Sequence, residues 1–318
     1  MAVYTDLTDE ELRDLLAAYD LGEATALKGI AEGVENSNFL LETERGRFIL
    51  TIYEKRVAPA DLPFFMRVME TLADAGFPAP RPMRRRDGAL LSGVRGKAAA
   101  IIAFLKGVSP RRPNVAQCRA LGETLARMHA ALADFPETRA NALNIAAWAD
   151  LVAPRLGDAE AMRAGLGAAL SGDLAALAAA WPADLPQGII HADLFPDNAL
   201  FLGDALSGVI DFYFACTDAL AYDLAVCLNA WCFDGRDYNI TKGAHLIAGY
   251  QSVRAFSAAE RDALPILCRG AAMRFFATRL ADWSATPAGA LVRPKDPLEY
   301  ADKLAFHRRA KGAEDYGA

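Results

Sequence analysis

The sequence lacks any apolar run of about 18 residues, the length needed to cross a membrane. Residues 1–6 contain neither a basic region nor an apolar signal core. Cysteine is scarce: the five cysteines are odd in number and scattered, which is typical of buried thiols and not of a disulfide framework or a zinc site. These absences argue against a membrane-spanning or disulfide-stabilised protein, and we expect a cytoplasmic one.

Positive charge is also in deficit, with 34 Lys and Arg against 40 Asp and Glu, for a net charge of −6. This balance argues against nucleic acid as a general partner. The sequence has no Gly-x-Gly-x-x-Gly and no Walker motif, so it signals a phosphate-binding loop only weakly. No repeat or low-complexity tract is present. Hydrophobic residues make up 53% of the 318 residues, enough for a substantial core in one large or two ordinary domains.

One stretch combines buried and polar character. Residues 188–201 read Gly-Ile-Ile-His-Ala-Asp-Leu-Phe-Pro-Asp-Asn-Ala-Leu-Phe. The apolar flanks predict two short buried strands, and Pro196 favours a loop between them. Burying a carboxylate and an amide beside Ile and Phe costs several kcal/mol unless these groups are used or paired. Thirteen residues after Asn198, a second apolar run ends in Asp211.

This spacing matches the needs of phosphoryl transfer, which are a base for the attacking hydroxyl and ligands for magnesium. His191, Asp193 and Asn198 have the offsets of the kinase loop His-Arg-Asp-x-x-x-x-Asn, with Ala192 in the place of Arg. Residues 211–213, Asp-Phe-Tyr, correspond to Asp-Phe-Gly. The alternative interpretation is an ordinary strand–loop–strand with a capped turn. The complete set favours the kinase interpretation.

The rest of the chain divides by composition. Residues 1–105 predict a strand-rich part with an inserted helix, and later segments are rich in helical periodicity. The change in composition near residues 105–113 predicts a boundary between residues 1–105 and residues 106–318. The resemblance given below implies that the first part binds the nucleotide and that the second carries catalysis and substrate binding. Helices are expected at 9–19, 62–75, 117–133, 146–180 and 258–283, and strands at 47–55 and 97–107.

Two polar residues outside the loop are interpreted as structural. His129 lies on or beside the apolar face of the helix expected at 117–133, where a lone histidine is more often a satisfied core residue than a ligand. Asp223 precedes Leu224 in a Tyr-Asp-Leu-Ala stretch and is interpreted as the cap of a helix.

The chain resembles the aminoglycoside-phosphotransferase-like kinases, which are related to protein kinases, and within them the bacterial homoserine kinases. The superfamily resemblance is carried by residues 77–82, 121–129, 191–198, 209–212 and 218–225, and the closer one by 35–39, 50–55 and 62–65. It implies a two-lobed α+β fold of the protein-kinase type. The N-terminal lobe would be an antiparallel sheet with one helix, and the larger C-terminal lobe would be mainly helical.

The resemblance implies ATP-dependent phosphorylation of the side-chain hydroxyl of L-homoserine. Asp193 would be the catalytic base, and Asn198 and Asp211 would bind Mg²⁺. The turn around Ser37 would cover the nucleotide phosphates, and backbone near Ala103 would meet adenine. The nucleotide-binding residues expected in this way are Asn36, Ser37, Asn38, Lys55, Ala103 and Leu105.

One departure concerns a Lys–Glu pair that the superfamily usually has. By spacing, Thr51 takes the Lys position, and Phe65 or Met66 falls near the Glu position. Both charges are missing together, so neither is left buried without a partner. Strand alternation puts Thr51 and Lys55 on one face, and we suggest that Lys55 reaches the phosphates instead.

The residues that hold the acceptor are predicted from the chemistry of a small zwitterion. Tyr213 and Trp231 are expected as walls, and Arg274, or alternatively Arg279, as the partner of the carboxylate. Two other functions stay open. One is a kinase for another small alcohol, such as a choline-like compound, a sugar or an aminoglycoside. The other is a nucleotide-binding module without turnover, suggested by the missing Lys–Glu pair. The sequence does not predict an oligomeric state.

Overall fold

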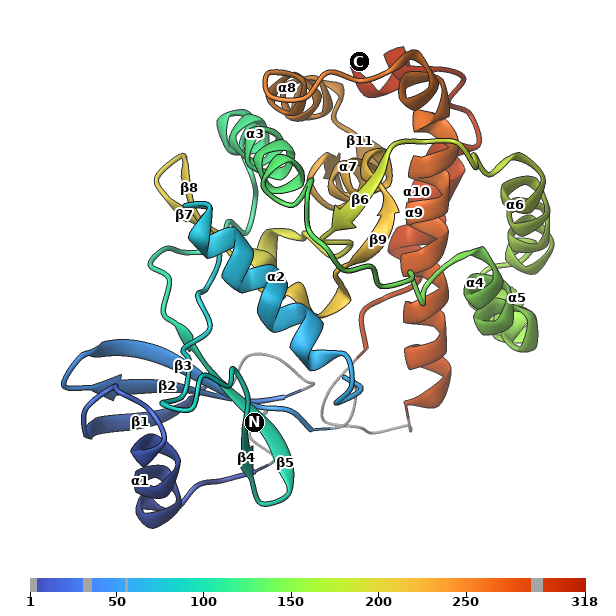
Figure 1. The fold of residues 1–318 in the computed structure, drawn as a ribbon. Helices are drawn as coiled ribbons and strands as arrows, with labels where there is room; N and C mark the ends of the chain where they lie inside the picture. The colour runs from blue at the N-terminus through green and yellow to red at the C-terminus, as the bar shows by residue number, and fades with distance from the viewer. Residues whose placement is uncertain (1–4, 31–35, 55–56, 287–293) are drawn as a thin grey trace.

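The computed structural model describes residues 5–30, 36–54, 57–286 and 294–318. The N-terminal part is a five-stranded antiparallel sheet in the order β1-β2-β3-β5-β4. Helix α1 covers the face away from the helical part, and α2 lies between the sheet and that part (Figure 1). These elements are α1 (Asp9–Ala17), β1 (Ala24–Ile30), β2 (Ser37–Thr43), β3 (Gly46–Ile52), α2 (Leu62–Asp74), β4 (Ser92–Val94) and β5 (Lys97–Ala103).

Strand β3 shows how the sequence pattern forms this sheet. Phe48 and Leu50 are buried in one cluster with Leu15 of α1, on the outer face. Tyr53, which follows the strand, belongs to the core cluster shared with α2 and the helical part, on the other face. Thr51 is buried and shares the face of Tyr53, because successive side chains of a strand alternate. The face of β3 that carries Thr51 therefore lies toward α2 and the helical part, as the alternation predicts.

The larger part contains eight helices and three two-stranded sheets within the described residues. The long α9 runs through it, with α4, α5 and α6 on one side and α3, α7 and α8 on the other (Figure 1). Its elements are α3 (Val115–Ala131), α4 (Ile145–Val152), α5 (Leu156–Met162), α6 (Leu166–Ala180), β6 (Gln187–Ile190), β7 (Ala199–Leu202), β8 (Ala205–Val209), β9 (Cys216–Ala219), α7 (Leu220–Trp231), β10 (Phe233–Asp234), β11 (Asp237–Tyr238), α8 (Ile240–Gln251), α9 (Ala258–Ala285) and α10 (Leu298–His307).

The segment expected to be helical from 146 to 180 is broken into α4, α5 and α6, with a 3₁₀ turn before α5. Pro154 lies in that turn and cannot donate the backbone hydrogen bond that a continuous helix needs. Helix α5 ends at Met162, where Arg163 is extended, and Gly165 has φ of 78°, a left-handed conformation that precedes α6. The other expected helices are confirmed, with ends shifted by a few residues.

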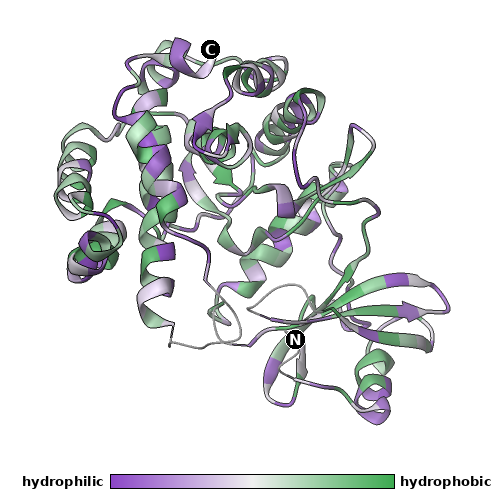
Figure 2. Cartoon of the chain, turned by 180° about the vertical axis from the view of Figure 1, so that it is seen from behind, coloured by the Kyte–Doolittle hydropathy of each residue, from purple (hydrophilic) through white to green (hydrophobic). Residues whose placement is uncertain are grey.

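The fold class predicted from the resemblance is confirmed: an antiparallel sheet part with one inserted helix is followed by a larger, mainly helical part. Hydrophobic and hydrophilic residues alternate along the long α9, which packs on both sides (Figure 2). The chain passes between the parts after Ala103, and Val108 already donates a backbone hydrogen bond to Phe201 at 3.0 Å. The predicted division between residues 105 and 106 lies in this connection and stays a prediction. None of the described helices is both long and apolar enough for a bilayer.

His307 at the end of α10 makes stability depend on pH. It is buried, with Nδ1 2.9 Å from the Tyr316 hydroxyl and Nε2 2.9 Å from Oδ1 of Asn229. Asn229 donates through Nδ2 to the carbonyl groups of Ala225 and Cys268, so its Oδ1 accepts from Nε2–H of His307. Burial, with help from Lys303, lowers the pKa of His307 from 6.5 to about 3.

We therefore expect the free energy of unfolding to fall as the pH drops from about 6.5 towards 3. Over this interval the unfolded chain binds a proton that the folded chain excludes, which costs about 1.4 kcal/mol per pH unit. Replacing His307 by Gln removes this contribution, so the variant has a shallower pH dependence than the wild type. Urea unfolding of both proteins between pH 7 and pH 4 measures the difference in slope. Equal slopes would contradict the assignment.

Candidate active site

The polar loop between β6 and β7 carries Asp193 and Asn198. The Asn198 Nδ2 amide donates to the Asp193 carbonyl at 2.8 Å and lies 3.4 Å from the Asp193 carboxylate. The Asn198 N–H donates to the Phe195 carbonyl at 3.0 Å, which closes the turn around Pro196. The Asp193 side chain keeps 19% of its surface exposed. The loop thus presents a carboxylate whose position is set by the amide five residues later.

Asp211 is brought to this loop by two bonds through its neighbour Ile210. The Ile210 N–H donates to the Asn198 carbonyl at 2.9 Å, and its carbonyl accepts from Nε2 of His191 at 3.0 Å. Asp211 itself has φ of 65° and an exposed side chain. The structure therefore brings Asp211, after β8, next to the loop that carries Asp193 and Asn198.

His191 holds the loop as a neutral side chain. Burial lowers the pKa of His191 below 6.5, although the nearby Asp223 carboxylate opposes this shift. Because Nε2 donates to Ile210, the other ring nitrogen, Nδ1, accepts from the Asp193 N–H at 3.3 Å. The histidine of the motif thus links Asp193 to the segment that follows β8 and carries Asp211.

Asp223 is not the helix cap that the sequence predicted. Helix α7 begins at Leu220, and the Asp223 side chain points back to the loop. Its two oxygens accept from the His191 and Ala192 N–H groups, both at 2.8 Å, and from Nε2 of His129 at 3.0 Å. Burial raises the pKa of the Asp223 carboxyl, but the hydrogen bond and charge of His129 and the nearby His191 hold it below its usual value. Asp223 therefore acts as a buried anchor for the loop.

The partner of this anchor, His129, is a satisfied core histidine, as predicted. Its Nδ1 lies 2.9 Å from the Tyr250 hydroxyl of α8. Helices α3 and α8 come close enough for this contact because a glycine of each helix lies against the backbone of the other. A Cβ at Gly122 would lie 2.0 Å from the Leu246 carbonyl oxygen, and one at Gly249 would lie 2.1 Å from that of Arg119.

Arg274 of α9 reaches the loop from the other side. Its guanidinium is 2% exposed and donates from Nη1 to the Ala192 carbonyl, with Nη2 3.9 Å from Oδ1 of Asp193. It stacks 4.5 Å from the ring centroid of Phe275 and 5.5 Å from that of Phe214. A cation from α9 therefore lies next to the position where Ala192 replaces the arginine of the kinase motif. The sequence prediction that Arg274 binds the acceptor carboxylate is not tested by this geometry.

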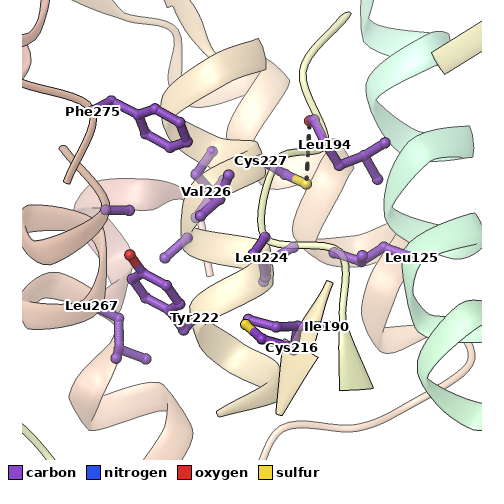
Figure 3. Packing of buried hydrophobic residues seen from close by; sticks show 14 of the residues in the cluster. Leu125, Ile190, Leu194, Cys216, Tyr222, Leu224, Val226, Cys227, Leu267 and Phe275 are labelled. Atoms are coloured by element: carbon purple, nitrogen blue, oxygen red, sulfur yellow. Dashed lines mark hydrogen bonds between the residues drawn. The ribbon is translucent and has the colours of Figure 1, made fainter. Parts of the chain in front are cut away.

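The other two expected acceptor residues, Tyr213 and Trp231, make hydrogen bonds within the fold. The half-buried Tyr213 shares a hydrogen bond with the Tyr53 hydroxyl at 2.9 Å, and burial raises its pKa to about 12. It therefore joins the Asp211 segment to the N-terminal sheet. Trp231 is 1% exposed and donates from Nε1 to the Leu194 carbonyl at 2.8 Å. Cys227 contacts the same carbonyl, as Figure 3 shows, so two residues of α7 hold this part of the loop. Trp231 is the other of the two.

The polar side chains before and at the start of β2 are fixed by their neighbours. Asn38 accepts from the Thr51 hydroxyl at 2.8 Å, and Ser37 donates to Glu54 at 2.7 Å. Asn36 accepts from the Glu54 N–H at 3.3 Å. Glu54 in turn pairs with Lys97, an ion pair that the sequence interpretation missed because its partners are 43 residues apart. Lys55, the suggested substitute for the missing lysine, lies outside the described residues.

The segment expected to meet adenine connects β5 to the helical part. Ala103 donates its N–H to the Arg81 carbonyl at 2.8 Å, so its amide is used within the fold. Leu105 lies over β8: a Cβ at Gly208 would be 3.0 Å from Leu105 Cδ1. The connection therefore runs beside the β7–β8 hairpin, between the N-terminal sheet and the helical part.

Comparison with known proteins agrees with this geometry. Residues 26–256 match the phosphotransferase enzyme family. The chain is 59% identical to a homoserine kinase of Hyphomonas neptunium, covering 100% of both chains, and 59% identical to one of Caulobacter sp., covering 100% of this chain and 99% of the other. The structure of amicoumacin kinase hAmiN in complex with AMP-PNP, Ca²⁺ and Ami has a TM-score of 0.68, at 15% identity, over 95% of this chain and 92% of that one. The chain belongs to the phosphotransferase enzyme family and, within it, to the homoserine kinases.

Proposed function

We propose that this protein transfers the γ-phosphoryl group of ATP to the side-chain hydroxyl of L-homoserine, which yields ADP and O-phospho-L-homoserine. The observation that supports homoserine as the substrate is the 59% identity with a homoserine kinase over the whole chain. The position of Asp211 next to the loop that carries Asp193 and Asn198 supports the chemistry.

In this reaction Asp193 is the base. The acceptor oxygen forms a bond to the γ-phosphorus as the bond to the β,γ-bridging oxygen breaks, and the hydroxyl proton passes to the Asp193 carboxylate. Asp193 suits this role because it is partly exposed while Asn198 and Arg274 contact it or its neighbour from two sides. A positioned base of this kind contributes about 10²–10⁴ to the rate.

Asn198 and Asp211 fit a magnesium ion that is shared with the nucleotide phosphates. Asn198 uses Nδ2 to hold Asp193, which leaves its amide oxygen facing the opposite way. Asp211 contributes an exposed carboxylate immediately before the 3₁₀ turn Phe212–Phe214. Mg²⁺ usually takes only one or two carboxylates and fills its remaining positions with water and phosphate. This agrees with the absence, among the described residues, of any group of three or more His, Cys, Asp or Glu side chains that could bind a metal alone. The ion would neutralise charge on the transferred phosphoryl group.

For the nucleotide, we keep Asn36–Asn38 over the phosphates and the Ala103–Leu105 connection beside adenine. The sequence predicted a turn around these three residues, but Ser37 and Asn38 lie in β2. Ser37 bonds to Glu54, which follows β3, Asn38 bonds to Thr51 of β3, and Leu105 of the connection packs on Gly208. Lys55 stays a prediction. Because the Asn36, Ser37 and Asn38 side chains bond within the fold, backbone N–H groups are the candidates for phosphate contact.

The proposal is tested by purified protein with Mg–ATP and a panel of alcohols, followed by ADP release. We expect L-homoserine to give a much higher kcat/KM than choline, methylthioribose or kanamycin. L-serine should be poor, because its hydroxyl is one methylene too short to reach Asp193 while its charged ends stay anchored. Turnover of another alcohol without turnover of homoserine would support a kinase activity but reject homoserine as the acceptor. ADP release with none of them would favour a nucleotide-binding module.

A further inference from the structure

Three residues that depart from the kinase pattern lie close together in the structure. Thr51 stands in the place of the lysine of β3, Phe65 of α2 in that of the glutamate, and Tyr213 in that of the glycine after Asp-Phe. The rings of Phe65 and Tyr213 pack edge to face, with centroids 5.8 Å apart. Tyr213 therefore lies against the position where a kinase has the acid of its Lys–Glu pair.

The Tyr213 hydroxyl links this group of residues to the sheet. It shares a hydrogen bond of 2.9 Å with the Tyr53 hydroxyl, and the two rings lie edge to face at 5.3 Å. Burial raises the pKa of Tyr213 to about 12; its hydrogen bond with Tyr53 opposes this rise, the Asp211 carboxylate adds to it, and a hydrogen bond with Thr51 opposes it. The Thr51 hydroxyl in turn donates to Oδ1 of Asn38 at 2.8 Å. A neutral chain of hydroxyls thus runs from β2 and β3 to the segment after β8.

The backbone of that segment needs to be held in place. Asp211 has φ of 65°, a conformation that is uncommon for a residue with a side chain and persists where the surrounding structure fixes it. On one side of it, Phe212 is 1% exposed and packs 4.8 Å from the His191 ring of the helical part. On the other side, Tyr213 reaches the N-terminal sheet. Asp211 is therefore held from both parts of the molecule.

Helix α2 is fixed without a Lys–Glu pair. Asp61, just before the helix, accepts from Nη2 of Arg139 at 2.7 Å and from its Nε at 3.0 Å. Arg67 of the helix pairs with Glu137, and the Arg139 guanidinium lies 4.9 Å from the centroid of the Phe65 ring. In protein kinases the Lys–Glu pair and the metal-binding Asp must be in place together. Because α2 is bound to the helical part, the connection that remains is the one between the sheet and the segment after β8.

We propose that Tyr213 is a positioning residue for the Mg²⁺ that Asp211 would bind, and that its hydroxyl makes this connection together with Tyr53 and Thr51. The inference rests on the proposed function, because it concerns the same nucleotide and metal ion. It gives Tyr213 a role beside the nucleotide, in place of the acceptor wall that the sequence predicted. Because the hydroxyls carry no charge, their loss should weaken nucleotide binding only where Mg²⁺ takes part.

The test is equilibrium binding of AMP-PNP with and without Mg²⁺, which needs neither an acceptor nor turnover. Tyr213→Phe keeps the ring and its contact with Phe65 but removes the hydroxyl. We expect its affinity for AMP-PNP with Mg²⁺ to fall about three- to tenfold, the usual effect of losing one or two hydrogen bonds. Its affinity without Mg²⁺ and its KM for homoserine should stay at the wild-type values.

Two further variants test the chain of hydroxyls and the specificity of the effect. Tyr53→Phe should weaken binding in the same direction, and the double variant should lose no more than Tyr213→Phe alone, because the two residues share one hydrogen bond. Fully additive losses would contradict the chain. Tyr19→Phe is the matched control: its hydroxyl lies 2.9 Å from Oγ of Ser92, in the N-terminal part, and its loss should leave AMP-PNP binding unchanged.

The outcomes separate this inference from the proposed function. A lower melting temperature of Tyr213→Phe with an unchanged effect of Mg²⁺ would make Tyr213 merely structural and overturn the inference. A raised KM for homoserine with unchanged AMP-PNP binding would return Tyr213 to the acceptor wall and also overturn it. Equal binding by the wild type with and without Mg²⁺ would reject the metal site, and this inference with it. Failure to phosphorylate homoserine would reject only the proposed acceptor.

Discussion

Replacing Asp193 by Asn is expected to lower kcat by about 10²–10⁴-fold, while nucleotide binding and the melting temperature stay near wild-type values. The reason is that Asn has nearly the same shape but does not accept the hydroxyl proton. The contacts that hold the loop involve the backbone at this position, namely the Asp193 carbonyl with Asn198 and its N–H with His191. The substitution therefore removes the base and keeps its surroundings. Steady-state kinetics and a thermal melt measure the two effects.

The matched control is Asp197→Asn in the same loop. The Asp197 side chain is 79% exposed, and its closest cation, Lys295, lies 3.9 Å away. An exposed pair of this kind is worth little, so kcat should change less than about threefold. Near-normal kcat in Asp193→Asn would reject Asp193 as the base. Equal losses in both variants would mean that the negative charge of the loop, and not one positioned carboxylate, supports the reaction.

Substituting Arg274 is expected to give the second-largest loss. Arg274→Met leaves the buried Ala192 carbonyl without its donor and removes a cation 3.9 Å from the Asp193 carboxylate. A hydrogen bond to a charged group contributes about 1.5–3 kcal/mol, so kcat should fall about 10–10²-fold with little change in the KM for homoserine. Arg274→Lys keeps the charge but loses the planar fork, and it should recover part of the rate.

The split between kcat and KM decides between two roles for Arg274. Loss of kcat alone identifies it as a positioning residue for the loop. A raised KM for homoserine with normal kcat would instead support the sequence prediction that it binds the acceptor carboxylate. Arg279→Lys is the comparison on the same helix, because Arg279, the alternative partner of the carboxylate, pairs with Glu299 at 2.6 Å and makes no hydrogen bond or ion pair with the loop among the described residues. It should leave both constants near wild-type values. Thermal melts exclude misfolding as the cause.

Local patterns in the sequence determined much of this protein. The offsets of His191, Asp193 and Asn198 and the apolar run before Asp211 predicted which side chains meet at the site. The alternation of side chains along β3 predicted that Thr51 and Tyr53 lie on the same face. Such inferences succeed because strand alternation and loop spacing depend on near neighbours in the chain. Residues 146–180 show the limit of this approach. Their many helix-forming residues led to the prediction of one helical segment, although Pro154 and Gly165 interrupt it.

Which residues hold the site in place was decided only by the tertiary structure. Asp223 looked like a helix cap, because its three loop-holding contacts come from residues 31 to 94 positions away. The guanidinium of Arg274 reaches the Ala192 carbonyl across 82 residues, and Lys97 reaches Glu54 across 43. A buried charge must find a partner, but its sequence neighbours do not specify which one. The packing of α3, α7, α8 and α9 makes that choice around the loop, and the pairing of β3 with β5 makes it for Lys97 and Glu54. The sequence by itself thus supplied the candidate reacting groups, and the fold supplied what holds them in place.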